Sequence, residues 1–254
     1  MNKNKRVVVG MSGGVDSSVT ALLLKQQGYD VVGLFMRNWE YGIKGSQCPN
    51  RIEFEDAKKV GALIGIEVLG KDFVKEYKDR VFDVFLDGLK QGLTPNPDIL
   101  CNKEIKFNVF LNEAKKMGAD MIATGHYAKI AKYKDHFVLD TPKDSSKDQS
   151  YFLHALSSEQ LSHAMFPLGD LTKKEVREIA RAHNLPVSDK KDSTGICFIG
   201  NQKFDEFITQ HLQAIPGDII DENGKVLGKK HKGLVCYTLG QRKGIGLGGI
   251  KENE

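Results

Sequence analysis

Short apolar runs rich in β-branched residues alternate with helical patterns through the first half of the chain. Four runs have the length and composition of strands, and they are Arg6 to Val9, Val31 to Phe35, Ile66 to Leu69 and Met121 to Thr124. The intervening helices end where a left-handed C-cap is needed, at Gly28, Gly65 and Gly118. This alternation is typical of a parallel sheet with crossover helices, so the sequence predicts a Rossmann-like α/β fold.

Three further patterns extend this prediction. A helix over residues 74–89 carries one apolar face that we interpret as core, made by Val74, Tyr77, Val81, Phe82, Phe85 and Leu89. The runs 128–133 and 137–139 predict a hairpin with its turn at residues 134–136. Thr172 and Glu175 form a capping box for a helix that we expect to end near His183, with Asn184 as its C-cap.

The last part of the chain has a different character. From Pro216 onward, β-type runs at 218–221 and 226–227 flank an Asn223-Gly224 turn, and glycines crowd the residues after 240. We therefore predict a catalytic domain over residues 1–200 and a small, mostly β second domain over residues 201–254 that ends before a closed sheet is complete.

Composition excludes several classes of protein. No apolar stretch is long enough to cross a bilayer, and the basic start runs directly into a strand rather than a signal sequence, so we expect a cytoplasmic protein. A net charge of +4 permits a nucleic-acid partner without requiring one. The four cysteines form no C-x-x-C pair, which argues against a zinc ribbon.

The segment S-G-G-V-D-S, residues 12–17, lies between the first predicted strand and a helix. Glycines let the backbone approach phosphate oxygens, serines donate hydrogen bonds, and the helix N-terminus attracts anions. The segment fits neither the Walker pattern nor G-x-G-x-x-G. It resembles the loop of the ATP pyrophosphatases, in which Asp16 would help to organise Mg²⁺. A plain Gly/Ser turn that caps a helix is the alternative.

Two distant segments each contain a cysteine in a setting that favours a thiolate. Cys101 follows the loop Asn96-Pro97-Asp98 at an apparent helix start, with Lys103 nearby. Cys197 ends the basic, hydroxyl-rich segment that begins at Lys190. For either cysteine taken alone, a small buried apolar residue is the alternative, and it is the more common fate of a free cysteine.

Taken together, the motifs resemble those of bacterial tRNA 2-thiouridylases. They occur in the family's order across nearly the whole chain: the phosphate loop, T-P-N-P-D-x-L-C-N-K-E-I-K-F, A-T-G-H-Y-A, K-D-Q-S-Y-F-L and K-x-D-S-T-G-I-C-F-I-G. The resemblance implies that ATP adenylates the 2-oxygen of the wobble uridine in the glutamate, lysine and glutamine tRNAs before sulfur replaces it. The implied ATP-binding residues are Gly10, Met11, Ser12, Gly13, Gly14, Val15, Asp16, Ser17, Met36 and Gly125. Strand packing for Met36 and a tight turn for Gly125 are about as plausible.

The resemblance also implies the sulfur chemistry and its partners. Cys197 would carry a persulfide sulfur from a cysteine desulfurase or a sulfur-relay protein, and Cys101 would release that sulfur. The resulting disulfide would need an external thiol reductant. Asp98 would act as acid or base. The target base and the tRNA would contact Asn96, Pro97, Asp98, Lys147, Asp148 and Gln149.

Some alternatives stay open at this point. His126 and Tyr127 could line the ATP site, residues 147–149 could be a solvated helix start, and an iron–sulfur cluster would need more thiolates than the two placed for chemistry. Family members continue into a further C-terminal β-barrel that grips the tRNA, and this sequence ends before it. We therefore keep two other hypotheses, an amide- or amidine-forming ATP pyrophosphatase and a catalytically idle tRNA-binding protein.

Overall fold

The computed structural model describes residues 5–40, 48–192, 198–199, 203–228 and 230–247. The chain divides into two compact units, one made of residues 1–81 and 98–194, the other of residues 82–97 and 195–254. Each unit is described separately below. Within the described ranges, no helix combines the length and the apolar composition that a membrane crossing requires.

A parallel five-stranded sheet forms the centre of the first unit. Its strand order is β3-β2-β1-β4-β7. The strands are β1 (Arg6–Gly10), β2 (Asp30–Arg37), β3 (Glu67–Asp72), β4 (Met121–Ala123) and β7 (Ala164–Met165). All four predicted strands are therefore confirmed, and the two-residue β7 was missed because it is too short to show a pattern. Val7, Val8 and Val9 are completely buried, as expected for a central strand covered on both faces.

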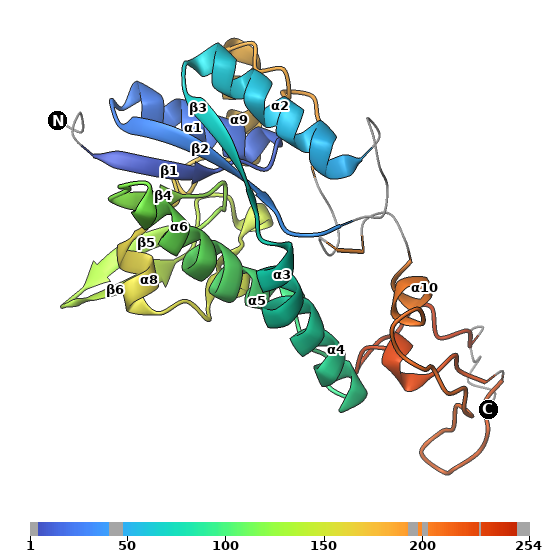
Figure 1. Ribbon diagram of the computed structural model, residues 1–254. Helices are drawn as coiled ribbons and strands as arrows, with labels where there is room; N and C mark the ends of the chain where they lie inside the picture. The colour runs from blue at the N-terminus through green and yellow to red at the C-terminus, as the bar shows by residue number, and fades with distance from the viewer. Residues whose placement is uncertain (1–4, 41–47, 193–197, 200–202, 229, 248–254) are drawn as a thin grey trace. The chain divides into compact units, whose positions relative to one another are not determined.

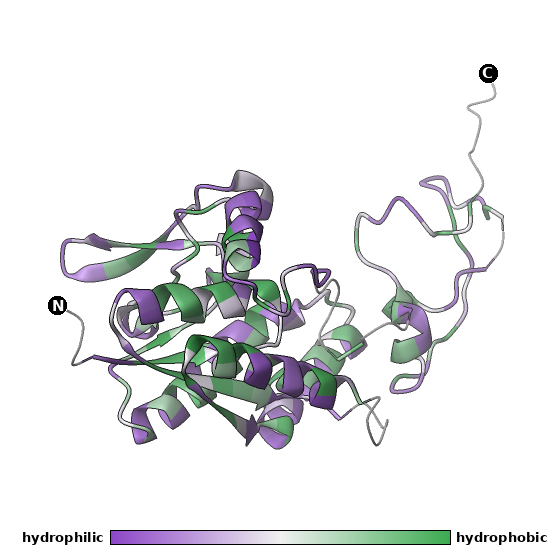
Figure 2. Ribbon diagram, turned by 90° about the horizontal axis from the view of Figure 1, so that it is seen from above, coloured by the Kyte–Doolittle hydropathy of each residue, from purple (hydrophilic) through white to green (hydrophobic). Residues whose placement is uncertain are grey.

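Helices cover both faces of this sheet (Figure 1). On one face, α1 (Val15–Gln26), α2 (Pro49–Ile64) and α9 (Lys173–Ala182) pack in one apolar cluster with Val7, Val9 and Phe35. On the other lies α6 (Phe110–Lys116), whose Phe110 is fully buried. Figure 2 shows the longer helices alternating between apolar and polar residues, as expected of helices that bury one side. The Rossmann-like α/β class is confirmed.

Two helical stretches contain a wider π-helical turn. In the first, α3 (Val74–Tyr77) continues through η2 (Lys78–Phe82) into α4 (Asp83–Lys90). In the second, α5 (Pro97–Leu100) continues through η3 (Cys101–Val109) into α6. The predicted apolar face of residues 74–89 is buried except for the partly exposed Val74. A π-helical turn adds one residue to a helix, and such turns are frequent at functional sites.

Local turn chemistry follows the sequence closely. Gly28, Gly65 and Gly118 have φ of 83°, 71° and 75°, which confirms the three left-handed helix ends. The hairpin pairs β5 (Lys129–Tyr133) with β6 (His136–Asp140), so His136 belongs to a strand rather than to the turn. Thr172 and Glu175 form the complete capping box of α9, and Asn184 is left-handed after its end.

The remaining elements of the first unit are short. They are η4 (Ser145–Lys147), α7 (Ser150–Leu153) and α8 (Ser158–Ser162). Ser157 and Gln160 give α8 a capping box of its own.

The second unit has an aromatic core. The Phe82 ring lies 5.1 Å from that of Phe198 and 6.0 Å from that of Phe207, with the partners meeting edge to face. Its later elements are α10 (Phe204–Ile208) and η5 (Leu234–Cys236). Among the described residues of this unit, the predicted β-type runs meet in the isolated bridge Ile220–Val226, around a turn at Gly224, and a second isolated bridge joins Gly217 to His231. The boundary at residue 200 stays a prediction.

Candidate functional site

The loop after β1 has the backbone geometry that anion binding requires. The helix α1 begins at Val15, and its N-cap residue, Gly14, has no side chain that could cap the helix. The backbone N–H of Ser12 donates to the Ser17 hydroxyl oxygen at 3.2 Å, and the two hydroxyl oxygens are also 3.2 Å apart. The loop is therefore folded over the N-terminus of a twelve-residue helix, where N–H groups and the helix dipole favour phosphate.

Glycines at two positions let other segments approach this loop. Gly13 has φ of 71°, and a Cβ there would lie 2.3 Å from the carbonyl oxygen of Glu53 in α2. Gly125, which follows β4, packs against the first turn of α1, because its Cβ would lie 2.8 Å from the Ser17 nitrogen. The sequence left Gly125 open between a tight turn and a ligand contact, and this close packing is a structural reason for a glycine there.

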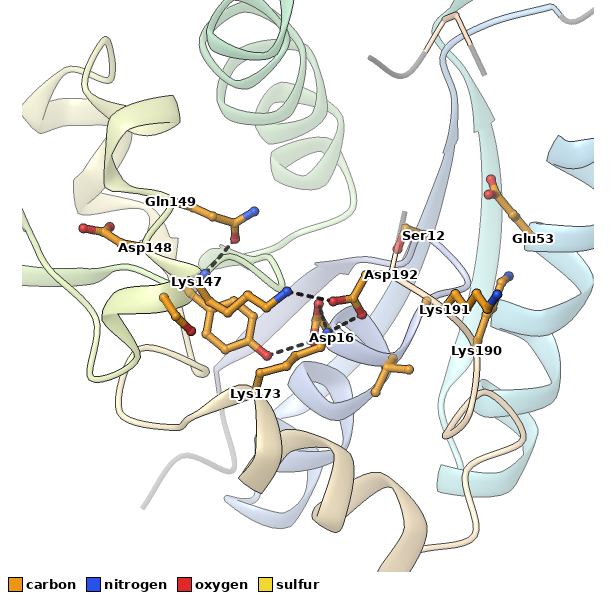
Figure 3. Close-up of a pocket in the computed structure, with 14 residues that line it drawn as sticks. Ser12, Asp16, Glu53, Lys147, Asp148, Gln149, Lys173, Lys190, Lys191 and Asp192 are labelled. Atoms are coloured by element: carbon orange, nitrogen blue, oxygen red, sulfur yellow. Dashed lines mark hydrogen bonds and ion pairs between the residues drawn. The ribbon is translucent and has the colours of Figure 1, made fainter. Parts of the chain in front are cut away.

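A cavity of about 380 Å³ opens beside the loop (Figure 3). Its lining comes from five segments of the first unit: the loop and α1, the start of α2, the residues after β4, the segment around η4, and the residues that begin and follow α9. The residues are Ser12, Gly14, Val15, Asp16, Glu53, Tyr127, Ser146, Lys147, Asp148, Gln149, Lys173, Lys190, Lys191 and Asp192. Four lysines and four carboxylates are among these residues, so the cavity presents charges of both signs.

Asp16 lies in a network of charged side chains in this cavity. The Lys173 ammonium is 2.8 Å from both carboxylate oxygens of Asp16, and the Tyr127 hydroxyl donates to the same carboxylate at 2.9 Å. Lys173 also pairs with Asp192 at 2.8 Å, and Lys147 reaches Asp192 at 3.0 Å. Figure 3 shows Lys147 and Lys173 pointing toward the two carboxylates.

In and around this network the pKa of one group, Asp192, is lowered, and the pKa values of two others, Glu53 and Tyr127, are raised. Although burial raises it, hydrogen bonds from Lys173 and Lys147 hold the pKa of Asp192 at about 2. Burial raises the pKa of Glu53, which Lys190 opposes. Burial and the Asp16 carboxylate raise the pKa of the Tyr127 hydroxyl, so this group stays a hydrogen-bond donor.

The segment predicted to contact tRNA borders the same cavity. Lys147, Asp148 and Gln149 all line it. The Gln149 side-chain oxygen accepts the backbone N–H of Tyr127 at 3.0 Å, which ties this segment to the residues after β4. Tyr127 lines this cavity, whereas His126 is buried, with its Nδ1 2.7 Å from the Thr124 hydroxyl oxygen, so a role of either residue in ATP binding stays a prediction.

Gly10, Met11 and Met36 lie at the carboxyl ends of neighbouring strands. Met11 is buried, and its N–H donates to the Leu34 carbonyl at 3.0 Å. The methyl carbon of Met36 would be 3.4 Å from a Cβ at Gly10. Met36 is only partly buried. These positions match the edge where open α/β sheets bind ligands.

The environment of Cys101 differs from the one that the sequence predicted. Its helix begins at Pro97, so Cys101 lies in the second turn rather than at an N-terminus, and the dipole argument for its thiolate was wrong. Lys103 is exposed and pairs with Glu104 at 3.8 Å. Cys101 itself is 6% exposed, and burial raises the pKa of its thiol while Lys106 lowers it.

The other predicted residues of this segment lie directly before Cys101. Pro97 is buried as the first residue of α5, and Asn96 precedes it. Burial raises the pKa of the Asp98 carboxyl, with Lys106 opposing the rise. A raised pKa suits a group that must both take and give a proton.

Cys197 lies outside the described residues, so its distance from Cys101 stays untested. Cys48 precedes α2 and Cys236 lies in η5, and both are partly exposed. Within the described ranges, no group of three or more histidine, cysteine or acidic side chains is placed to hold a metal ion.

Sequence reasoning missed Lys173, Glu53 and Asp192 as residues that line the cavity beside the phosphate loop. Lys190 and Asp192 stand in the motif that ends at Cys197, where the lysines were interpreted as favouring sulfur anions. In the structure the Lys190 ammonium instead donates to the Gly13 carbonyl at 3.0 Å. For Lys173 the available signal was its position directly after the capping Thr172, at the N-terminus of a helix.

Comparison with known proteins gives a consistent family. Residues 5–201 match the family described as tRNA methyl transferase HUP domain, and residues 205–254 match the tRNA methyl transferase PRC-barrel domain. The chain is 95% identical over 254 residues to tRNA-specific 2-thiouridylase MnmA 2 of Aliarcobacter butzleri, covering all of this chain and 69% of that protein. It is 55% identical to tRNA-specific 2-thiouridylase MnmA of Methylobacillus flagellatus, covering 98% of this chain and 69% of that protein. It is 54% identical to tRNA-specific 2-thiouridylase MnmA of Staphylococcus aureus, covering 98% of this chain and 67% of that protein.

Proposed function

This chain belongs to the family of bacterial tRNA-specific 2-thiouridylases, and we propose that it replaces the 2-oxygen of the wobble uridine in glutamate, lysine and glutamine tRNAs with sulfur, at the expense of ATP. The observation that carries this proposal is the 95% identity to a protein of that name across the whole chain. The enzyme class is accordingly a tRNA-uridine 2-sulfurtransferase.

Adenylation is the first step. The uridine 2-oxygen attacks the α-phosphorus of ATP, the bond to the β-phosphate bridging oxygen breaks, and pyrophosphate leaves with that electron pair. The loop from Gly10 to Ser17 would hold the leaving pyrophosphate at the N-terminus of α1. Lys173 and Lys190, which lie in the adjoining cavity, would balance its charge. Met36 and Gly125 would border the rest of the nucleotide.

Mg²⁺ would arrive with ATP rather than occupy a cage of protein ligands. Mg²⁺ in nucleotide sites is held by one or two carboxylates together with phosphate oxygens. Asp16 and Asp192 both line the cavity and fit that donor set. When bound, the ion supplies charge neutralisation at the phosphates. Asp16 now lies between Lys173 and the Tyr127 hydroxyl, which together hold its carboxylate toward the cavity.

Sulfur transfer follows adenylation. Cys197 would carry a persulfide from a cysteine desulfurase or a relay protein, and its terminal sulfur would attack the activated 2-carbon, so that AMP leaves with the electrons of the carbon–oxygen bond. The Cys101 thiolate would then attack the Cys197 sulfur. The bond between the Cys197 sulfur and the transferred sulfur would break, and its electron pair would leave with the transferred sulfur on the base. A Cys101–Cys197 disulfide would remain, and an external thiol would reduce it.

The tRNA would reach the site along two segments. Asn96, Pro97 and Asp98 would line the position of the flipped uracil, with Asp98 exchanging protons there. Lys147, Asp148 and Gln149 border the cavity of the phosphate loop, so polar contacts from these residues to the tRNA would lie beside the nucleotide.

One assay tests the whole proposal. The chain is incubated with ATP, Mg²⁺, a persulfide donor, a thiol reductant and unmodified tRNA, and AMP and the modified nucleoside are measured by mass spectrometry. We expect AMP and 2-thiouridine from the parent chain. Cys101→Ser and Cys197→Ser should make no 2-thiouridine, whereas Cys236→Ser, a partly exposed cysteine without an assigned role, should behave as the parent.

The same assay distinguishes the alternatives. Unchanged thiolation in both cysteine variants would refute the sulfur-relay mechanism, and no AMP above background would favour a tRNA-binding protein without catalysis. In a separate incubation that also contains a methyl donor, a nucleoside carrying the mass of an added methyl group would support the activity that the family description names.

A further inference from the structure

The helix that contains Cys101 has a geometry that selects one lysine as its neighbour. Residues 101–109 form a π-helix, in which the N–H of Phe110 bonds the carbonyl of Ile105, five residues back. Cys101 and Lys106 are separated by the same five residues, so this hydrogen-bond pattern turns their side chains toward one face of the helix. In an α-helix five residues exceed a turn of about 3.6 residues by roughly two fifths of a turn, which would turn Lys106 away from Cys101.

The position of the Lys106 ammonium is fixed by a buried histidine. Its Nζ lies 3.3 Å from Nε2 of His126, and Nδ1 of His126 lies 2.7 Å from the Thr124 hydroxyl oxygen. Burial and Lys106 hold the pKa of His126 well below its usual range, so the imidazole is neutral. Because Lys106 can only donate, the neutral ring accepts at Nε2 and donates from Nδ1 to Thr124. The partner that orients the ammonium is thus a neutral ring, which does not offset the positive charge as a carboxylate would.

Two acidic groups lie within the electrostatic reach of this ammonium. They are the Cys101 thiol and the Asp98 carboxyl, three residues apart at the start of the same helical stretch. For both groups burial opposes ionisation and Lys106 favours it. Asp98, when charged, also opposes ionisation of Cys101. A single negative charge can therefore be shared between the two groups beside one fixed cation.

We propose that Lys106 is the positioning residue of the sulfur-transfer site, where its His126-held ammonium stabilises the Cys101 thiolate while Asp98 receives the thiol proton. The step conserves charge: one carboxylate and one thiol become one carboxylic acid and one thiolate. The thiolate is then ready to attack the Cys197 sulfur, a step that rests on the function proposed above. Lys103, which the sequence suggested for this task, points to solvent.

The test measures the ionisation of Cys101 directly. In the full chain, Cys48, Cys197 and Cys236 are replaced by serine, so that Cys101 is the only thiol among the four cysteines. Cysteine labelled with ¹³C at Cβ then reports the thiol–thiolate equilibrium by NMR as pH is varied. Lys106→Met should raise the titration midpoint by about 1 pH unit or more, the size of effect expected for removal of a nearby opposite charge. Lys106→Arg should stay close to the parent.

The controls separate charge from packing. Lys103→Met removes an exposed lysine from the same helix and should leave the midpoint unchanged. Circular dichroism shows whether each variant is folded. If Lys106→Met does not fold, Lys106→Gln replaces it as the neutral variant. A neutral variant that titrates like the parent overturns the proposal, and so does an equal rise in Lys106→Arg. This titration needs neither tRNA nor ATP, so a failure of the proposed function would appear separately, as absent 2-thiouridine.

Discussion

Gly13 is the residue on which the geometry of the phosphate loop depends most. Its φ of 71° and the Glu53 carbonyl 2.3 Å from a Cβ both exclude a larger side chain. We expect Gly13→Ala to lose about 1–2 kcal/mol of stability from backbone strain and about 1–3 kcal/mol more from the clash with α2. ATP binding should weaken as well, because α2 borders the cavity. Urea unfolding and ATP titration measure the two effects.

Gly28 provides a matched control for this prediction. Its φ of 83° imposes the same backbone strain, but a Cβ there would meet nothing within 4 Å. Gly28→Ala should therefore cost only about 1–2 kcal/mol and leave ATP binding unchanged. Equal stability losses in the two variants would mean that the contact between the loop and α2 is unimportant.

Asp192 should make part of the protein's stability depend on acidic pH. Its folded-state pKa of about 2 lies below the ordinary 3.8. A carboxyl with a lowered pKa stabilises the fold above its unfolded value, and this contribution is lost as pH falls from about 4 toward about 2. In urea unfolding at a series of pH values, Asp192→Asn should flatten the decline over this range relative to the parent. Glu175, whose pKa is also about 2, is present in both proteins, so the difference between them reports Asp192.

At the scale of elements, the start of α9 links stability to the candidate site. Thr172 and Glu175 form its capping box, and the next residue after Thr172, Lys173, reaches Asp16. Thr172→Ala should cost about 1 kcal/mol, as loss of a cap does. It should also raise the ATP concentration needed for half-saturation, since fraying of this turn moves Lys173. Thermal unfolding and ATP titration measure the two effects.

The helix α8 provides the comparison for that variant. Ser157 and Gln160 give it a capping box of the same type, and neither residue lines the cavity of the phosphate loop. Ser157→Ala should lower stability by a similar amount without changing ATP binding. Were ATP binding to weaken equally in both variants, the effect of Thr172 would be general destabilisation rather than displacement of Lys173.

The elements also explain what the sequence could and could not predict. Strands such as Arg6–Gly10, the glycine helix ends and the capping boxes were predictable because each depends on neighbouring residues. The π-helix at Cys101 was not predictable, because its wider turn has no local sequence pattern. The sequence therefore suggested Lys103 as the cation that favours the Cys101 thiolate, whereas in the structure Lys106 has this effect. The Asp16–Lys173 pair joins residues 157 positions apart, a contact that only the fold determines.

For the whole molecule, the described residues that line the cavity of the phosphate loop all come from the first unit. Every residue that lines the cavity of the phosphate loop belongs to residues 1–81 or 98–194. A ligand that binds only the folded state stabilises it, by about 2.7 kcal/mol at a hundredfold excess over Kd. ATP should therefore slow local opening in this unit and leave the second unit largely unaffected.

Hydrogen exchange of the full chain, followed by mass spectrometry with and without Mg²⁺ and ATP, tests this expectation. Protection should increase in peptides covering residues 10–18, 145–149 and 172–176, because these segments border the cavity and opening any of them releases the ligand. Peptides covering residues 204–212, which form the aromatic core of the second unit, should exchange as before. Equal protection in both units would show that nucleotide binding orders the whole chain, and the nucleotide site would then extend beyond the first unit.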